Sequence, residues 1–212
     1  IDAELAEVAS AGMPVRRIFL ADGDAMTLSY RRLRLILDAI NKYLPDVQRV
    51  ASYCLPRNIK NKTVDELTDL REKGLSLFYV GCESGDDEVL SCIDKGETYA
   101  SSLAALEKIR AAGMKSSVMI LNGLGGERFS EQHAVNSAKL MNAAQPDYLS
   151  TLVVTLPLGT ERMDTAFGGK FILPNQGGLL NEMQMLLSHL ELNKTIFRSD
   201  HASNYLVLKG VL

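Results

Sequence analysis

The chain has 212 residues with 46% hydrophobic content, enough to bury one large core. Its net charge is -3, its pI is near 5.7 and no run of Lys or Arg exceeds three, so the electrostatic footprint of a nucleic-acid binder is missing. No apolar run approaches the roughly 18 residues that a membrane span needs, and no signal peptide opens the chain. We therefore expect a cytoplasmic protein with one domain, residues 1–212, and neither a membrane nor a nucleic acid as partner.

The first stretch, "IDAELAEVASAGMP", is a helical pattern without upstream context, so we expect the sequence to be a piece of a longer chain. Five segments rich in β-branched and aromatic residues follow, separated by helical patterns, as in strand–helix–strand units. "LSLFYVG" and "SSVMIL" are apolar nearly throughout, which is typical of a parallel sheet covered on both faces. The predicted strands are 17–21, 49–55, 75–82, 114–121 and 148–156.

The helical segments between these strands carry boundary signals. Thr63 and Glu66 have the spacing of a capping box, and Gly74 and Gly113 end two helical patterns. The order of elements predicts an α/β fold with parallel strands, built as an open doubly wound sheet or as a closed or partial barrel. In both architectures ligands bind at the carboxyl ends of the strands.

Polar residues and glycines gather at four of the five predicted strand ends. Glycines let the backbone approach a ligand, and carboxylates accept hydrogen bonds from hydroxyl or ammonium groups. This edge therefore suits a ligand that bears an amine and a diol. The four ends are Asp22-Gly23-Asp24, the stretch "SYCLPRN", residues 81–85 and residues 122–126.

Each of these features also has a simpler interpretation. A single acid after a strand, such as Asp24 or Glu83, is more often the N-cap of the next helix. The glycines at 123–126 match no phosphate-loop spacing and can form an ordinary flexible loop. The coincidence of all the features at one edge of the sheet is what favours a binding site.

Five stretches of the chain resemble the radical S-adenosylmethionine superfamily, in particular its iron–sulfur oxidoreductases grouped with Elp3, MiaB and coproporphyrinogen-oxidase-like domains. The resemblance covers nearly the whole chain and is most specific in the third and the last stretch. It implies a partial (β/α) TIM-like barrel, of which about five or six βα units are present. The stretches are "RIFLADGDAM", "RVASYCLPRNI", "YVGCESGDDEVLSCIDKG", "MILNGLGG" and "FRSDHASNYLVLKG".

The resemblance also implies a chemistry and its cofactors. In this family a four-iron four-sulfur cluster reductively cleaves S-adenosylmethionine, and the 5'-deoxyadenosyl radical that forms abstracts hydrogen from a substrate. The implied partners are an electron donor, such as flavodoxin or ferredoxin, and a small-molecule or macromolecular substrate that the sequence does not identify.

The resemblance assigns several strand-end residues to parts of the cofactor. Asp22, Gly23 and Asp24 stand where the family has a Gly-Gly-Glu motif, so Asp24 would bind the methionine ammonium group. Glu83 would accept hydrogen bonds from the ribose hydroxyls. Lys95 would bind the methionine carboxylate, although a lysine at this place also complements the carboxyl end of a helix.

Two further strand ends complete the implied site. Gly123 would pass beneath the adenine, with Leu121 and Val154 as apolar contacts. Ser52 and Tyr53 would line the same edge, either near the cofactor or facing the substrate. The predicted site thus extends from the cofactor towards the substrate.

Two departures from the family pattern limit this assignment. Asp22 replaces a glycine and Asp24 shortens a glutamate by one methylene group, so the ammonium would lie closer to the backbone or bind through water. The family's C-x3-C-x2-C motif is absent. Cys54, Cys82 and Cys92 are too scattered for a cluster, a zinc site or a disulfide framework, so we expect reduced, mostly buried thiols. The fragment alone should be inactive, with the cluster loop upstream of it.

The tail and the helical segments add candidates. If "TIF", residues 195–197, is a further strand, His201 and Asn204 lie near the open mouth and can contact substrate, although a polar tail is more often solvated. His133 and His189 lie in helical patterns and are expected to be structural. The apolar stripe of 180–190 predicts core packing or a partner-binding face. Segment 159–178 is the best candidate for a mobile loop or substrate lid.

Three functions are consistent with these features. The first is the core of a radical S-adenosylmethionine oxidoreductase, in which the protein positions the cofactor. The second is an ordinary barrel enzyme of the aldolase or phosphate-binding kind, which needs a strand-end lysine or a phosphate nest, and neither is evident. The third is a non-catalytic barrel that binds a nucleotide or a partner protein. The sequence favours the first function.

Overall fold

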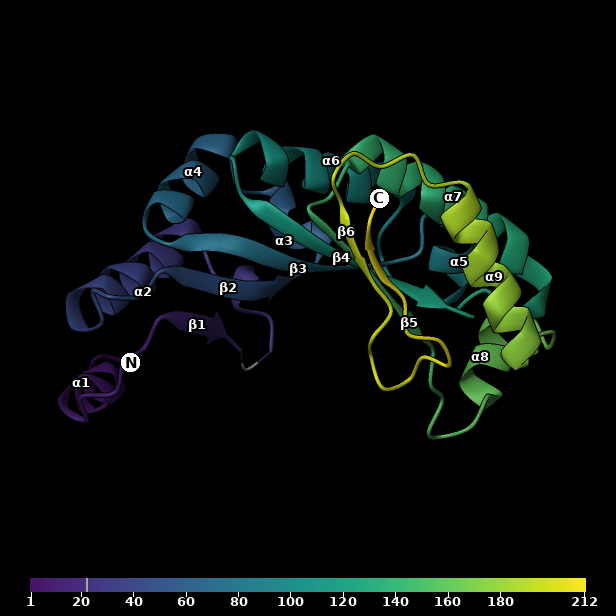
Figure 1. Cartoon of the computed structure of the whole chain (residues 1–212), viewed down its shortest axis with the longest axis horizontal. Helices are drawn as coiled ribbons and strands as arrows, with labels where there is room; N and C mark the ends of the chain where they lie inside the picture. Colours follow the sequence, from purple (N-terminus) through teal and green to yellow (C-terminus); the bar gives the residue numbers. More distant parts are fainter. Residues whose placement is uncertain (22) are drawn as a thin grey trace. The chain divides into compact units, whose positions relative to one another are not determined.

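In a computed structural model the chain is an α/β protein, and the seven strands of its described residues follow the order β1-β2-β3-β4-β5-β6-β7 in a mostly parallel sheet (Figure 1). The structure describes residues 1–21 and 23–212, so Asp22 lies outside the described residues. None of the described helices is both long and apolar enough to cross a membrane. The predicted fold class, α/β with parallel strands, is confirmed.

Each of the first five strands is followed by at least one helix, as the sequence predicts. The strands are β1 (Arg17–Leu20), β2 (Arg49–Cys54), β3 (Leu75–Glu83), β4 (Lys115–Asn122), β5 (Tyr148–Val153), β6 (Ile196–Arg198) and β7 (Lys209–Val211). The helices are α1 (Asp2–Ser10), α2 (Tyr30–Tyr43), α3 (Pro56–Lys60), α4 (Val64–Glu72), α5 (Asp87–Cys92), α6 (Tyr99–Ala111), α7 (Gly126–Ala144), α8 (Glu161–Ala166) and α9 (Gln176–Ser188), with a short 3-10 helix η1 (Ala25–Thr27).

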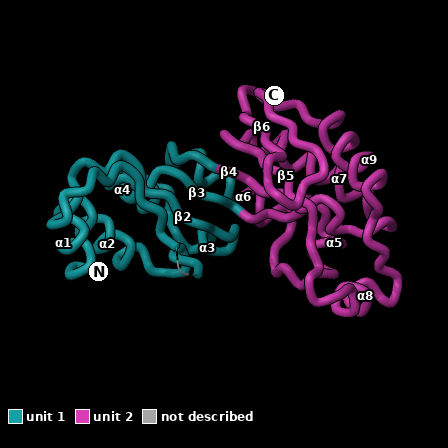
Figure 2. The backbone as a smooth tube through the Cα atoms, turned by 60° about the horizontal axis from the view of Figure 1, so that its bottom comes forward, with its two compact units in different colours: residues 1–80, 105–116 teal, residues 81–104, 117–212 magenta. Residues whose placement is uncertain are grey.

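The chain divides into two compact units, which Figure 2 colours separately. Unit 1 comprises residues 1–80 and 105–116, and unit 2 comprises residues 81–104 and 117–212. The boundaries fall inside β3, α6 and β4, so both units take part in the alternation of strands and helices along the chain.

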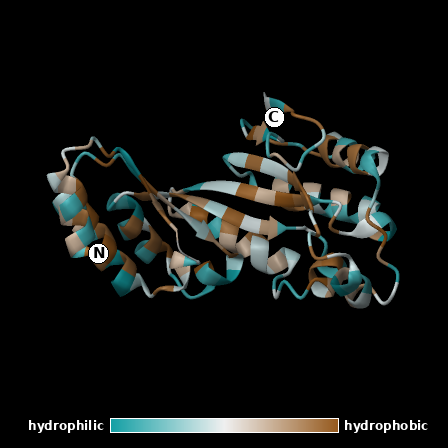
Figure 3. Ribbon diagram, turned by 90° about the horizontal axis from the view of Figure 1, so that it is seen from below, coloured by the Kyte–Doolittle hydropathy of each residue, from teal (hydrophilic) through white to brown (hydrophobic). Residues whose placement is uncertain are grey.

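Unit 1 is built on β2, which pairs in parallel with β1 and β3. On α2, the residues Leu33, Leu37 and Ile40 repeat at helical spacing and are buried, so this helix packs through one face. The predicted capping box starts α4: Glu66 N donates to Thr63 Oγ1 at 3.1 Å, and Thr63 N donates to Glu66 Oε2 at 2.9 Å. Figure 3 shows hydrophobic and hydrophilic segments alternating along the helices and strands.

Unit 2 contains β4, β5 and β6 in parallel pairs, and β7 closes it as an antiparallel partner of β6. The 19-residue helix α7 packs against α9, where the small residues Ala134 and Ala138 form a buried cluster with Leu186. A second apolar cluster joins the start of α7 to the segment after β5 through Phe129, Phe167 and other side chains.

The five predicted strands are confirmed, and "TIF" contributes to a sixth, β6. The sequence does not predict β7, because three residues reading "KGV" carry no strand pattern of their own. Segment 159–178 contains the helix α8, so it is not the continuous loop that its glycines suggest. The buried face of α9 is displaced by one position from most of the predicted stripe, and it includes Glu182 beside Leu179, Met183 and Leu186.

Candidate functional site

The end of β1 carries Gly23 and Asp24, predicted to bind the methionine ammonium group. Gly23 has a φ of 90°, and nothing lies within 4 Å of the position that a Cβ would take. Asp24 is the N-cap of η1, because its Oδ1 accepts a hydrogen bond from Met26 N at 3.1 Å. The capping alternative for Asp24 is therefore realised, and the second carboxylate oxygen is a further acceptor for a ligand.

Ser52 and Tyr53, on β2, have different surroundings. Ser52 is fully buried, and its hydroxyl lies 3.3 Å from Leu20 O and 3.0 Å from Tyr53 O. The ring of Tyr53 is half exposed and packs in a group of aromatic side chains with Phe19, 4.7 Å away between centroids, and Tyr79, 6.2 Å away. Of the two predicted residues, only Tyr53 has an exposed side chain, and its role in binding stays a prediction.

Glu83, the last residue of β3, and Lys95 are predicted to bind the ribose and the methionine carboxylate. The structure brings them together, with Lys95 Nζ 2.9 Å from Glu83 Oε1 and side-chain exposures of 15% and 20%. Glu83 has a φ of 65°, in the left-handed region that costs a residue other than glycine about 1–2 kcal/mol. Its carboxylate folds back over Gly81, where an added Cβ would lie 2.6 Å from Oε1. Backbone strain of this kind is concentrated at functional sites.

The residues after Glu83 are held tightly against α7. Gly85 N donates to Ser137 Oγ at 2.9 Å, and a Cβ at position 85 would collide with Asn136 O. The carboxylate of Asp86 caps α5 through Val89 N, 2.9 Å away. Burial alone would raise the pKa of Asp86, but its hydrogen bonds, from Val89 and Asn136 among others, lower it below the ordinary value. Contacts with α7 and the cap of α5 therefore fix the conformation of residues 84–86.

The end of β4 brings together the three residues predicted to contact adenine. Gly123 has a φ of 85°, and an added Cβ would lie 3.4 Å from Val154 Cγ1 and 2.7 Å from Leu179 Cδ2. Val154 N donates to Asn122 O at 2.9 Å, which continues the pairing of β4 and β5. Leu121 and Val154 are partly buried and pack against the same apolar cluster of unit 2.

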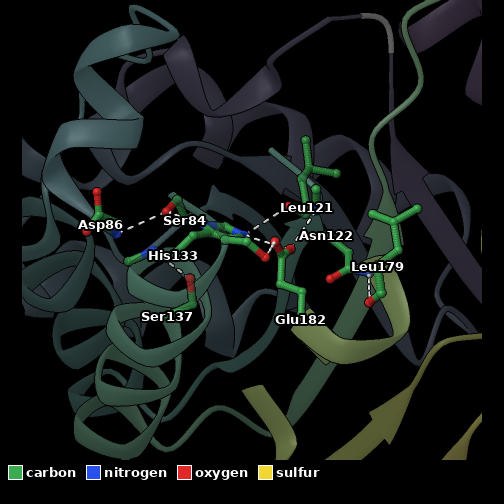
Figure 4. A network of polar contacts seen from close by, with 11 residues as sticks. Ser84, Asp86, Leu121, Asn122, His133, Ser137, Leu179 and Glu182 are labelled. Carbon is green, nitrogen blue, oxygen red and sulfur yellow. Dashed lines mark hydrogen bonds and ion pairs between the residues drawn. The ribbon is translucent and has the colours of Figure 1, made fainter. Parts of the chain in front are cut away.

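Glu182, on α9, reaches the end of β4 from within the core of unit 2 (Figure 4). Its Oε1 accepts a hydrogen bond from Gly123 N at 2.6 Å, and its Oε2 accepts one from Ser130 Oγ at 2.5 Å. The side chain is almost fully buried. Burial raises the pKa of Glu182 to about 7, against the two hydrogen bonds, which lower it. The carboxyl group is therefore balanced between its protonated and ionised forms near neutral pH.

His133, on α7, links the ends of β3 and β4 (Figure 4). Its Nε2 lies 3.0 Å from Leu121 O, and because a carbonyl only accepts, Nε2 carries the proton. Nδ1 then accepts a hydrogen bond from Ser84 Oγ at 2.7 Å. Burial lowers the pKa of His133 to about 4, so its 3.8 Å approach to Glu182 Oε1 is not an ion pair at neutral pH. The imidazole is a neutral bridge between two strand ends.

The tail places His201 and Asn204 beside the end of β5. Asn204 Nδ2 donates to Thr151 O at 2.8 Å, and His201 Nδ1 lies 2.8 Å from Ser203 Oγ, which accepts from Val153 N at 3.2 Å. His201 is exposed and is therefore accessible to a ligand. In the described part of the chain, Asn204 Oδ1 and Thr151 Oγ1 are buried without a hydrogen-bond partner. The substrate role of His201 and Asn204 stays a prediction.

The three cysteines do not fit an iron–sulfur cluster. Cys54, Cys82 and Cys92 are thiols, and the first two are buried. Burial raises the pKa of Cys82 to about 12, which keeps this thiol protonated. Among residues 1–21 and 23–212, no group of three His, Cys, Asp or Glu side chains could hold a metal ion. A cluster requires three thiolates in one place, so this set of side chains does not provide them.

Two residues of the network were not predicted as parts of a site. His133 is expected to be structural, and its hydrogen bonds agree with that, but they join two predicted ligand-binding loops. Glu182 is not singled out, although the sequence contains a signal for it: in "GLLNEMQMLL" a glutamate interrupts an apolar stripe at a position that helical periodicity buries. An acid at such a position needs hydrogen-bond partners inside the core.

A comparison with protein families gives the identity of the fold. The family model of the Radical SAM superfamily matches residues 1–138, well over half of the chain. The chain belongs to the Radical SAM superfamily, as its motifs predict.

Individual relatives are distant. The heme chaperone HemW of Bacillus subtilis (strain 168) is 22% identical over 187 residues, which are 87% of this chain and 48% of the relative. The coproporphyrinogen III oxidase HemN of Escherichia coli, a radical SAM enzyme, superposes with a TM-score of 0.68 at 17% identity, covering 88% of this chain and 43% of HemN. The archaeal Elp3 of Methanocaldococcus infernus superposes with a TM-score of 0.61 at 16% identity, covering 94% of this chain and 52% of Elp3.

At these identities the structural likeness establishes the fold alone. The radical SAM partial-barrel fold that the sequence predicts is confirmed. The chain spans about half the length of the curated relative that it matches.

Proposed function

We propose that this chain is the S-adenosylmethionine-binding core of a radical S-adenosylmethionine oxidoreductase. In the whole protein, reductive cleavage of the cofactor would give a 5'-deoxyadenosyl radical for hydrogen abstraction from a substrate. Membership of the superfamily supports the reaction type, and the strand ends of unit 2 support the binding role.

The Glu83–Lys95 pair at the end of β3 is the observation that carries the proposal. It joins a glutamate in the left-handed region to a lysine at 2.9 Å, a strained arrangement that needs a reason. A ligand with a diol and a carboxylate would use both groups, because Glu83 accepts from hydroxyls and Lys95 donates to a carboxylate. Until the ligand binds, each charge compensates the other.

The remaining predicted residues would hold the other parts of the cofactor. Gly123 would bring the backbone beneath the adenine, with Leu121 and Val154 as the apolar surface around it. Asp24 would bind the ammonium group through the carboxylate oxygen that does not cap η1. Tyr53 would face the substrate. The cofactor supplies the radical chemistry, and this chain binds and orients it.

The cluster ligands would come from residues outside this sequence, because the three cysteines present do not fit the cluster. The 212-residue chain alone is therefore expected not to cleave S-adenosylmethionine. An electron donor such as flavodoxin or ferredoxin would act on the whole protein.

The proposal is tested on the full protein, including the segment that supplies the cluster ligands, loaded anaerobically with iron and sulfide. With S-adenosylmethionine and dithionite we expect 5'-deoxyadenosine, detected by mass spectrometry, and a strong reduction in the Glu83→Gln variant. The 212-residue chain serves as the matched control and should form none. A full protein that carries a cluster, yet neither binds S-adenosylmethionine nor forms 5'-deoxyadenosine, would contradict the proposal.

A non-catalytic role in binding heme is the second candidate, because the relative HemW is named a heme chaperone. Unit 1 offers Phe19, Tyr53 and Tyr79 as a partly exposed aromatic group on which a planar ring can stack. Titration of the full protein with heme distinguishes the candidates. A shifted Soret band that is lost in Tyr53→Ala, without formation of 5'-deoxyadenosine, would favour the heme-binding role.

A further inference from the structure

The buried side chains of Glu182 and His133 contact the main chain at the end of β4, and His133 also contacts the Ser84 hydroxyl after β3. Glu182 accepts a hydrogen bond from Gly123 N at 2.6 Å, and His133 donates one to Leu121 O at 3.0 Å, so α9 and α7 each hold one backbone group at the end of β4. Through Ser84, the same imidazole also fixes the first residue after β3. His133 therefore joins the loop that follows Glu83 to the strand end that precedes Gly123.

An apolar side chain at position 182 would fill the core without the free-energy cost of burying a carboxyl group. A leucine there would, however, leave Gly123 N without its acceptor. The carboxyl group also needs a second donor, which Ser130 supplies at 2.5 Å. Both oxygens of Glu182 are therefore hydrogen-bonded, one to α7 and one to the loop of residues 122–126. Core packing alone does not require such a polar network.

We propose that Glu182 and His133 are positioning residues of the cofactor site, which hold the loop beneath the adenine and the loop beside the ribose in a fixed relation before the ligand binds. The inference rests on the proposed function, since it deepens the role of the same site. Neither residue touches the cofactor. They act through Gly123 and Ser84, and preorganised loops bind a ligand more tightly because less conformational entropy is lost.

The test uses the full, cluster-loaded protein and S-adenosylhomocysteine, which binds without being cleaved. In Glu182→Gln the amide group donates where the carboxylate accepted, so either Ser130 Oγ must reverse its hydrogen bond or Gly123 N loses its acceptor. We expect the affinity, measured by isothermal titration calorimetry, to fall about 10- to 100-fold, as is typical when a supporting partner of a binding group is removed. Amide hydrogen exchange across residues 121–126 should become faster. Glu131→Gln, on the exposed face of α7, is the matched control and should behave as wild type.

A milder pair of variants keeps the test decisive if Glu182→Gln does not fold. Ser130→Ala removes one donor to the carboxylate, whereas Ser130→Thr retains the hydroxyl group. We expect Ser130→Ala to weaken binding severalfold and Ser130→Thr to restore it, a rescue that altered packing would not produce.

The outcomes separate this inference from the proposed function. Wild-type affinity together with unchanged exchange at residues 121–126 in Glu182→Gln would overturn the positioning role. Absence of binding in the wild type would instead overturn the proposed function, and the exchange comparison would still decide whether Glu182 fixes the loop.

Discussion

The end of β1 in unit 1 and the ends of β3 and β4 in unit 2 look alike in the sequence, since each combines glycines with polar residues after an apolar strand. Their surroundings differ. At the end of β1, Gly23 has nothing within 4 Å of its Cβ position, and Asp24 makes a local cap to Met26 N. In unit 2, Gly85 packs on the backbone of α7, and Gly123 N donates a hydrogen bond to the buried carboxyl group of Glu182.

This difference separates two ways of building a ligand-binding loop. The loops of unit 2 owe their conformation to long-range contacts with α7 and α9, so they exist in the free protein. The loop after β1 depends on its own residues, and a ligand would contribute more to its order. Variants that insert volume, remove charge or change pH should therefore affect the two regions by different amounts.

The largest contrast is expected from adding one methyl group to each loop. In Gly85→Ala the new Cβ would collide with Asn136 O and lie 2.7 Å from Ser137 Cα, so the backbone must move. We expect a loss of about 3 kcal/mol or more in the free energy of unfolding. Gly23→Ala meets open space and bears only the strain of its positive φ, about 1 kcal/mol. Urea denaturation of both variants gives the comparison, and equal losses would show that the two loops are constrained alike.

The second contrast is in the pH dependence of stability, to which the network of unit 2 contributes two titrations of opposite sign. The pKa of Glu182 is raised from 4.5 to about 7, so the folded state retains a proton that the unfolded state loses, and stability falls as pH rises through that interval. The pKa of His133 is lowered from 6.5 to about 4, so stability falls as pH drops through that interval. Where the intervals overlap, the two effects have opposite signs and largely cancel in the wild type.

Single variants should expose each half of this cancellation. In Glu182→Gln the His133 effect alone is left, and the free energy of unfolding should rise by up to about 3 kcal/mol between pH 4 and 6.5. In His133→Gln it should fall by a similar amount between pH 4.5 and 7. Asp86, whose pKa is lowered, loses its contribution only below its ordinary value of 3.8, outside this range. Parallel pH profiles for the two variants would refute the opposed titrations.

The sequence predicts the strands and the polar strand ends well because both are local patterns. Apolar runs mark β3 and β4, and the capping box at Thr63 marks the start of α4 within one turn. The network around Glu182 is not predictable in the same way, because its hydrogen-bond partners Gly123 and Ser130 lie 59 and 52 residues away in the chain. Only the fold brings them together. β7 is missed for the same reason, since its strand character comes from pairing with β6.

The strained backbone of Glu83 lowers the free energy of unfolding if its carboxylate is kept for binding rather than for the fold. Asparagine adopts the left-handed region more readily than glutamate, so Glu83→Asn relieves strain while it removes the ion pair with Lys95. We expect these effects to offset each other to within about 0.5 kcal/mol of unfolding free energy. Affinity for S-adenosylhomocysteine should fall about tenfold, because a charged hydrogen-bond acceptor is lost. An asparagine variant that is less stable yet binds as wild type would show that the pair serves the fold.

The smallest effect, and the sharpest for unit 1, is expected at Asp24. Asparagine caps a helix as well as aspartate does, so Asp24→Asn should leave the free energy of unfolding within about 0.3 kcal/mol of the wild type. Asp24→Ala loses the hydrogen bond from Met26 N, and its free energy of unfolding should fall by about 0.5 kcal/mol.

Binding measurements separate the capping role of Asp24 from a role in the cofactor site. If the carboxylate binds the methionine ammonium group, both variants weaken S-adenosylhomocysteine binding, because the neutral amide lacks the charge that attracts a cation. If Asp24 only caps η1, the asparagine variant binds like the wild type, and the ammonium partner must be sought elsewhere. Calorimetric titration of the two variants side by side therefore decides whether the end of β1 belongs to the cofactor site at all.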